Sequence, residues 1–148
     1  MTLYIKDEQG ISKTYEDAKI IRQEVFINEQ QIPAELEFDN QENNRVHYVG
    51  YQVDNAGESV PATTARIHEQ HDNWHIERVA TVKDLRGNGF AKQLFTKIIQ
   101  DAREKDISVV ALGAQLHATG FYEELGFVQQ GDVFMDAGIE HITMTLHI

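Results

Sequence analysis

The period of the apolar residues changes in the middle of this chain, and that change constrains the fold more than any other feature. Before residue 83, apolar residues alternate with polar ones or form short β-branched runs, which predicts strands at 46–53, 60–67 and 74–82. After residue 89 they recur at the spacing of one helix face. This helical stripe consists of Phe90, Ala91, Leu94, Phe95, Ile98, Ile99 and Ala102.

Further strands and helices are expected on both sides of this unit. Thr14, with Asp17 three residues later, resembles a helix N-cap, and its helix is expected to run to about Phe26 or Ile27. Residues 28–44 are expected to form a loop with at most a short helix. A second short helix carries Ala118, Phe121, Tyr122 and Leu125 at helical spacing and stops at Gly126. Additional strands are expected at 2–5, 107–112, 127–135 and 140–147.

This order of elements predicts an α/β (α+β) fold, in which a mixed central sheet is flanked by helices. The 148 residues contain no repeat and no linker, so a single domain over 1–148 is expected. The net charge of −11 argues against nonspecific binding to nucleic acid or to an anionic membrane. The absence of cysteine excludes disulfides and thiolate metal sites. No basic region followed by an apolar stretch opens the chain, so we expect a cytoplasmic protein.

The loop between the strand and the long helix reads Arg86-Gly87-Asn88-Gly89. A plain turn is one interpretation. The other is an anion site, because the first N–H groups of a helix lack partners and glycines leave them accessible. Walker A has no match here, and the dinucleotide fingerprint fails because Lys92 stands where it requires glycine or alanine.

A different motif fits. Arg86-x-x-Gly89-x-Ala91 matches the acetyl-CoA motif [QR]-x-x-G-x-[GA] of the GNAT N-acetyltransferases, and the stretch IERVATVKDLRGNGFAKQLF is similar to the fourth strand and central helix of that superfamily. Downstream, AQLHATGFYEELGF resembles the next helix with its tyrosine. The resemblance covers about residues 77–127. The segments VFINEQ, ELEFD and FMDAGIEHITM also resemble the ElaA-like branch.

The resemblance implies a GNAT fold with a mostly antiparallel sheet, and acetyl-CoA as the acyl donor. It assigns Tyr122 to protonation of the departing thiolate, although periodicity alone reads this tyrosine as a core residue. The backbone N–H of Val79 would stabilise the oxyanion. Gln115 stands where the family commonly has an asparagine that contacts pantetheine. The remaining implied cofactor contacts are pantetheine at Val79, Ala80 and Thr81, and pyrophosphate at Arg86, Gly87, Asn88, Gly89, Phe90, Ala91 and Lys92.

The proton acceptor and the amine site are open to several interpretations. Glu77 is the first candidate for a general base, and His117 and His141 are others, while a water relay would need none of them. An acidic loop with Glu35, Glu37 and Asp39 would attract a cationic amine, or it is simply solvated. We place Glu37, His117 and His141 at the acceptor site.

No metal is expected. The sequence His68-Glu-Gln-His71 is one residue shorter than the zinc motif H-E-x-x-H, and it lies in an expected hairpin turn.

The sequence therefore predicts an acetyltransferase acting on an amine of a small molecule or peptide by direct attack in a ternary complex. One alternative is a non-catalytic acyl-CoA-binding module, and another is a structural domain in which the glycine loop is only a turn. The expected partner is the amine acceptor, with a homodimer as one possible assembly.

Overall fold

The computed structural model describes residues 3–148, which form a seven-stranded sheet of order β1-β2-β3-β4-β5-β7-β6. Neighbouring strands run antiparallel except for β4 and β5, which are parallel. This confirms the mixed, mostly antiparallel sheet. The strands are β1 (Leu3–Gln9), β2 (Val46–Val53), β3 (Ser59–Gln70), β4 (Asn73–Thr81), β5 (Val109–Gln115), β6 (Val128–Asp136) and β7 (Ile139–His147).

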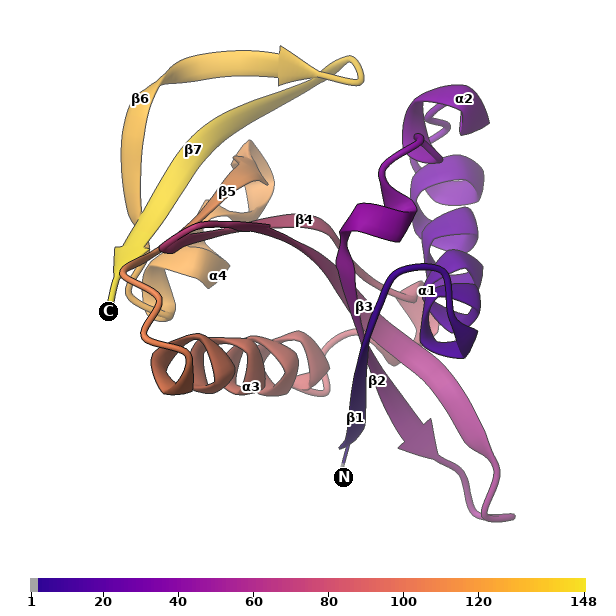
Figure 1. The fold of residues 1–148 in the computed structure, drawn as a ribbon. Coiled ribbons are helices and arrows are strands. Elements are labelled where there is room, and N and C mark those ends of the chain that lie inside the picture. Colours follow the sequence, from indigo (N-terminus) through magenta and orange to yellow (C-terminus); the bar gives the residue numbers. More distant parts are fainter. Residues whose placement is uncertain (1–2) are drawn as a thin grey trace.

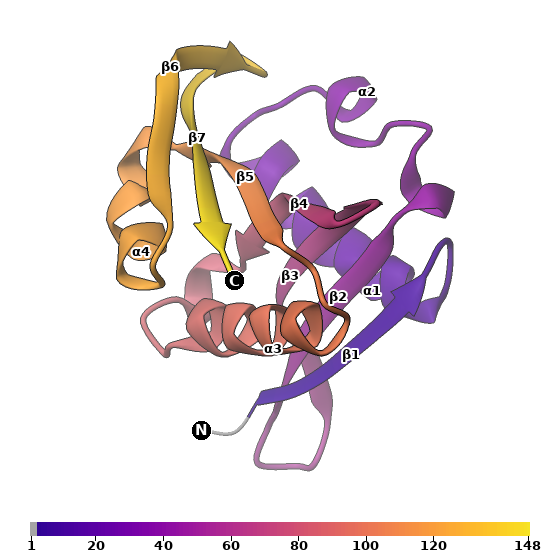
Figure 2. The same ribbon diagram turned by 60° about the vertical axis from the view of Figure 1, so that its left-hand side comes forward.

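Helices cover both faces of the sheet (Figures 1 and 2). Helix α1 and the π-helix η1 that continues it pack on one face, and α3 packs on the other. None of the helices within residues 3–148 has the length and apolarity needed to cross a bilayer. The helices are α1 (Lys13–Arg22), η1 (Gln23–Glu29), α2 (Ala34–Glu37), η2 (Glu42–Asn44), η3 (Lys83–Leu85), α3 (Phe90–Glu104), η4 (Leu116–Ala118) and α4 (Thr119–Glu124).

The main core lies between α3 and the sheet. The predicted stripe of α3 is buried at every position except Ala91, which is half-buried and lines a cavity instead. Leu94, Phe95 and Ile98 are fully buried beside Trp74 of β4. This burial fixes the direction in which the N-terminus of α3 points, and therefore the position of the glycine loop.

The first helix begins differently from the prediction. The N-cap is Ser12, whose hydroxyl accepts a hydrogen bond from the backbone N–H of Tyr15 at 3.1 Å. Thr14 already lies inside α1, and its hydroxyl donates to Glu8 at 2.6 Å. The Thr14 prediction was wrong because two hydroxyl residues stand two positions apart, and only the first has the extended backbone of a cap.

The first strand and the end of the first helical segment also differ from expectation. Strand β1 continues to Gln9, since as an edge strand it exposes its charged side chains to solvent; residue 2 of the expected strand lies outside the described residues. The helical path continues through η1 to Glu29 rather than ending near Phe26. The register of a π-turn is not visible in a 3.6-residue pattern.

Strands β4 and β5 pair over only part of their length. Their register runs from Asn73–Val109 to Ile76–Leu112 and then stops. Beyond this point β4 pairs only with β3, and β5 pairs only with β7. The two strands therefore separate from Glu77 onward, which opens the sheet in its middle.

Candidate active site

A cavity of about 820 Å³ lies where β4 and β5 separate. Its walls come from η1, from β4 beyond the splay, from β5 and α4, and from the hairpin of β6 and β7. Val79, Ala80 and Thr81, the residues expected to hold pantetheine, all line it. A cavity of this size matches those that bind small molecules.

A second cavity, of about 340 Å³, lies at the N-terminus of α3 and shares Thr81, Arg86, Ala91 and Phe121 with the first. The two cavities therefore adjoin, and together they extend from the splay to the glycine loop; we call this pair of cavities the groove. Of the predicted pyrophosphate residues, Arg86, Gly87, Gly89, Phe90, Ala91 and Lys92 line the second cavity. Asn88 does not line it, and its amide donates to the carbonyl of Leu85 at 2.9 Å.

The glycine loop is shaped by backbone conformation. Gly87 has φ = +81° and Gly89 has φ = +75°, both left-handed, and a Cβ at either position would meet no atom within 4 Å. Among residues 3–148, no side chain caps the N-terminus of α3. Its first residues, Phe90 to Lys92, line the second cavity, which is the arrangement that an anion site requires.

Arg86 is held at the edge of this loop by an ion pair. Its guanidinium donates to both carboxylate oxygens of Glu29 at 2.6 and 2.8 Å and to the carbonyl of Thr81 at 2.9 Å. The hydrogen bond from Arg86 lowers the pKa of Glu29. The first residue of the motif is thus paired with a carboxylate from η1.

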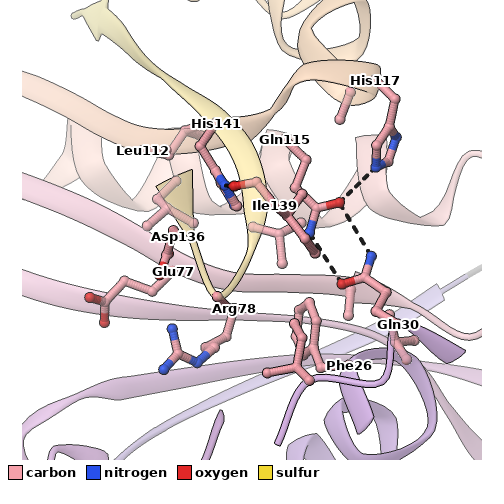
Figure 3. A pocket seen from close by; sticks show the side chains of 18 of the residues that line it. Phe26, Gln30, Glu77, Arg78, Leu112, Gln115, His117, Asp136, Ile139 and His141 are labelled. Atoms are coloured by element: carbon pink, nitrogen blue, oxygen red, sulfur yellow. Dashed lines mark hydrogen bonds between the residues drawn. The ribbon is translucent and has the colours of Figure 1, made fainter. Parts of the chain in front are cut away.

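Gln115 is likewise engaged by the segment that follows η1. Its amide exchanges hydrogen bonds with Gln30 at 3.2 Å, and its oxygen lies 2.6 Å from Nε2 of His117 (Figure 3). The bridge between Gln30 and Gln115 joins the two sides of the groove. The adjacent residues Glu29 and Gln30 therefore contact two of the polar side chains that the resemblance assigns to the cofactor, those of Arg86 and Gln115.

Tyr122 projects from α4 into the wall of the large cavity. Its ring packs edge-on against Phe95, Phe121 and Phe127, and its exposed fraction is 6%. Burial raises the pKa of the phenol, so it stays protonated. Tyr122 therefore packs in the core, as its helical spacing indicates, and also lines the cavity, as the proposed role of an acid requires.

Glu77 also lines the cavity, but its carboxylate is engaged. Oε1 accepts from Nε of Arg45 at 2.9 Å and from Nε of Arg66 at 3.0 Å. Desolvation, the largest influence, raises the pKa of Glu77, but the attraction of Arg66 and Arg45 outweighs it, and the net pKa is lowered. A carboxylate of this kind is a weak proton acceptor.

Two of the three carboxylates of the acidic loop, those of Glu37 and Asp39, are paired with arginines, while Glu35 is exposed. Glu37 is buried in the cavity wall, 2.7 Å from Nε of Arg22 and 3.1 Å from Nε of Arg78. Asp39 accepts two hydrogen bonds from Arg66, at 3.0 and 3.1 Å. These carboxylates therefore attach the loop to the sheet and offer little free negative charge to a cationic amine.

His141 lies on β7, opposite Gln115 of β5, and lines the cavity. Its Nδ1 is 2.7 Å from the carbonyl oxygen of Ile139, and its ring stacks on Phe134 with centroids 5.7 Å apart. His117 lines the same cavity from its exposed rim.

Sequence reasoning missed Glu29, Gln30 and the buried arginines. Arg22 and Arg66 are 1% and 2% exposed, and each pairs with carboxylates at least 11 residues away along the chain. One local signal existed, since Arg22 directly follows Ile21 on the buried side of α1, where an arginine requires acidic partners.

Comparisons with known proteins agree with this geometry. The family model described as the acetyltransferase (GNAT) domain matches residues 9–148. The N-acetyltransferase YjcF of Bacillus subtilis is 34% identical over 129 residues, which is 86% of this chain and 89% of that protein. The crystal structure of an N-acetyltransferase from Lactobacillus plantarum superposes with a TM-score of 0.87 at 27% identity, covering 99% of both chains.

The crystal structure of Escherichia coli ElaA superposes with a TM-score of 0.81 at 25% identity, covering 97% of this chain and 99% of that one. The match to the family model, the splayed strands and the uncapped glycine loop agree with one another. The chain belongs to the GNAT acetyltransferase family, in its ElaA-like branch, and is an acyltransferase.

Proposed function

We propose that this protein transfers an acetyl group from acetyl-CoA to an amine of a small molecule or peptide, by direct attack within a ternary complex. The observation that carries the proposal is the pair of adjoining cavities from the β4–β5 splay to the N-terminus of α3. One cavity offers a free strand edge and the other a helix N-terminus, which suits a ligand that has an extended arm and an anionic end.

In this proposal the chain binds the donor mainly with its backbone. The amides of Gly87 to Lys92 hold the pyrophosphate, with a charge-assisted contact from Arg86 once it leaves Glu29. The unpaired edge of β4 at Val79, Ala80 and Thr81 holds the pantetheine arm, with Gln115 on the facing strand.

The chemistry needs an oxyanion donor and an acid. The backbone N–H of Val79 stabilises the oxyanion that forms when the amine nitrogen attacks the thioester carbonyl. Tyr122 then gives its proton to the sulfur as the C–S bond breaks. A phenol in apolar surroundings suits this role because it remains protonated until negative charge develops beside it.

The structure favours an acceptor other than a polycation. Phe26, Ile32, Leu36, Phe134 and Ile139 all line the large cavity. Two of the three carboxylates of the acidic loop, those of Glu37 and Asp39, are paired with arginines. We propose a primary amine on an apolar or aromatic body, and we assign Glu37 and Glu77 to holding the loop in place.

Two measurements test the function. Calorimetry with acetyl-CoA is expected to show binding tighter than about 100 μM. Free-thiol release is then followed with phenethylamine, spermidine, lysine and a peptide with a free N-terminus, and phenethylamine is expected to be fastest. Binding without thiol release from any of these amines would favour the non-catalytic acyl-CoA module. No binding would leave only the structural domain.

The cytoplasmic location and the homodimer stay predictions.

A further inference from the structure

We propose that His141 is the general base of the transfer and accepts the proton that the acceptor amine must lose. The inference rests on the proposed function, since it concerns the same cavity and the same reaction. It is carried by the orientation of the imidazole, by its place in the cavity wall, and by the engagement of the other candidate bases.

The hydrogen bond at Nδ1 fixes which ring nitrogen is basic. Nδ1 lies 2.7 Å from the carbonyl oxygen of Ile139. A carbonyl only accepts hydrogen bonds, so Nδ1 carries the hydrogen and donates it. In the neutral ring the lone pair is therefore on Nε2, and His141 is set up to accept a proton there.

Nε2 belongs to a residue of the cavity wall and is accessible. No residue within 3–148 forms a hydrogen bond with it, and it is not among the fully enclosed polar atoms of that region. His141 is 9% exposed and lines the cavity beside Ile139 (Figure 3). Its ring stacks on Phe134, which restricts rotation of the imidazole. A general base needs a free lone pair on a side chain that is held in place at the site, and Nε2 of His141 meets both conditions.

The other basic groups of the cavity are less suited. The carboxylate of Glu77 is bound by two arginines, which hold its net pKa low against the effect of burial. His117 also has one nitrogen bonded to an oxygen, since its Nε2 lies 2.6 Å from Oε1 of Gln115, but its side chain is exposed at the rim of the cavity rather than buried in the wall. His75 lies before the splay, opposite Ala111, and burial lowers its pKa.

The proton balance closes with two residues. Nε2 of His141 takes a proton from the amine nitrogen as the N–C bond forms, and Tyr122 gives a proton to sulfur as the C–S bond breaks. The imidazolium keeps its Nδ1 hydrogen bond to Ile139 and later releases its proton to solvent, and the phenol is reprotonated from solvent.

Other titratable or charged groups also line this cavity and can affect the pH dependence of the reaction. They are Glu29, Glu37, His75, Glu77, Arg78, Arg86, His117, Tyr122 and Asp136.

The test compares His141→Gln with His147→Gln. His147 lies on the same strand, is exposed and does not line the cavity, so it controls for the loss of an imidazole. With acetyl-CoA and phenethylamine, His141→Gln is expected to lower kcat by about 100-fold or more. The fall of kcat/KM toward acidic pH, caused by protonation of the base, is expected to disappear. Calorimetric affinity for acetyl-CoA is expected to stay within about twofold.

A second variant, His141→Ala, guards against a merely structural effect. It leaves a space beside Phe134, and added imidazole is expected to restore part of the turnover with acetyl-CoA and phenethylamine. Near-normal turnover with an unchanged acidic limb in His141→Gln would overturn the assignment, and so would equal losses of kcat and acetyl-CoA affinity without imidazole rescue. If the wild-type protein binds no acetyl-CoA or turns over none of the four amines, the proposed function itself fails.

Discussion

Tyr122 places a phenol in apolar surroundings in the wall of the large cavity. Tyr122 contacts three phenylalanine rings, and no hydrogen bond of its hydroxyl joins it to another residue within 3–148. Removal of that hydroxyl should leave the packing almost unchanged, so that a kinetic effect can be separated from a structural one.

Tyr122→Phe is therefore expected to lower kcat by about 100-fold while the affinity for acetyl-CoA barely changes, because only protonation of the leaving thiolate is lost. Thiol-release kinetics and calorimetry measure the two quantities. Tyr4→Phe, which removes a hydroxyl from an exposed ring on β1, is the control. Equal and small effects on both quantities would remove the role of Tyr122 as an acid.

The glycine loop permits a similar separation. Gly89→Ala places a Cβ in open space but at φ = +75°, so its cost is backbone strain of about 1 kcal/mol rather than a clash. We expect urea unfolding to show this loss, and calorimetry to show weaker acetyl-CoA binding as the loop relaxes. Gly120→Ala, inside α4 where a Cβ also meets nothing, should cost no stability. Unchanged binding in Gly89→Ala would contradict the role of the loop.

Helix η1 and the residue that follows it contact two residues that we propose to bind the cofactor. Glu29 pairs with Arg86, and Gln30 bonds to Gln115. Because Glu29 neutralises the charge of Arg86 that would attract a pyrophosphate, we expect this ion pair to oppose cofactor binding. The side chain of Arg86 in this ion pair is 40% exposed, and exposed ion pairs contribute little to the free energy of unfolding.

Glu29→Gln is expected to tighten acetyl-CoA binding several-fold at low salt, because Arg86 is released while the helix is retained. The free energy of unfolding should change by less than about 1 kcal/mol. Calorimetry at two salt concentrations measures the effect. Glu16→Gln removes the same charge from the exposed face of α1 and should leave affinity unchanged. Weaker binding in Glu29→Gln would show that Glu29 supports the site instead.

Elements with a strong local period were predictable from the sequence, and contacts between distant residues were not. The stripe of α3 and the helix stop at Gly126, which has φ = +100°, follow from a few consecutive residues. The pair of Glu29 and Arg86 joins positions 57 apart, and nothing near either residue indicates the other. The glycine loop at the N-terminus of α3 was therefore predictable from the sequence, and the ion pairs beside it were not.

At the scale of the whole molecule, a network of buried arginines and carboxylates attaches the loop before β2 to the sheet. Arg66 contacts Asp39, Glu42 and Glu77, and is 2% exposed. Desolvation raises the pKa of Asp39, but the hydrogen bonds and charge of Arg66 and the N–H of Gln41 outweigh it and lower the pKa to about 2.

Because the pKa of Asp39 is lower in the folded protein than in the unfolded chain, the free energy of unfolding decreases as the pH falls. The contribution of Asp39 is present above its unfolded pKa of about 4 and is lost as pH falls toward 2. Urea unfolding should therefore show a steeper loss of stability over this range in the wild type than in Asp39→Asn. Asp132→Asn, at an exposed position of β6, should follow the wild type. Parallel curves for wild type and Asp39→Asn would contradict the ion-pair account.

The proposed function requires that the uncapped N-terminus of α3 and its two left-handed glycines hold the pyrophosphate of the acyl donor. A crystal structure of the protein with coenzyme A would show whether they do. We expect phosphate oxygens within hydrogen-bond distance of the amides between Gly87 and Lys92, with the pantetheine arm between β4 and β5 and Arg86 turned away from Glu29. Coenzyme A bound elsewhere, with that loop filled by a neighbouring side chain, would contradict it.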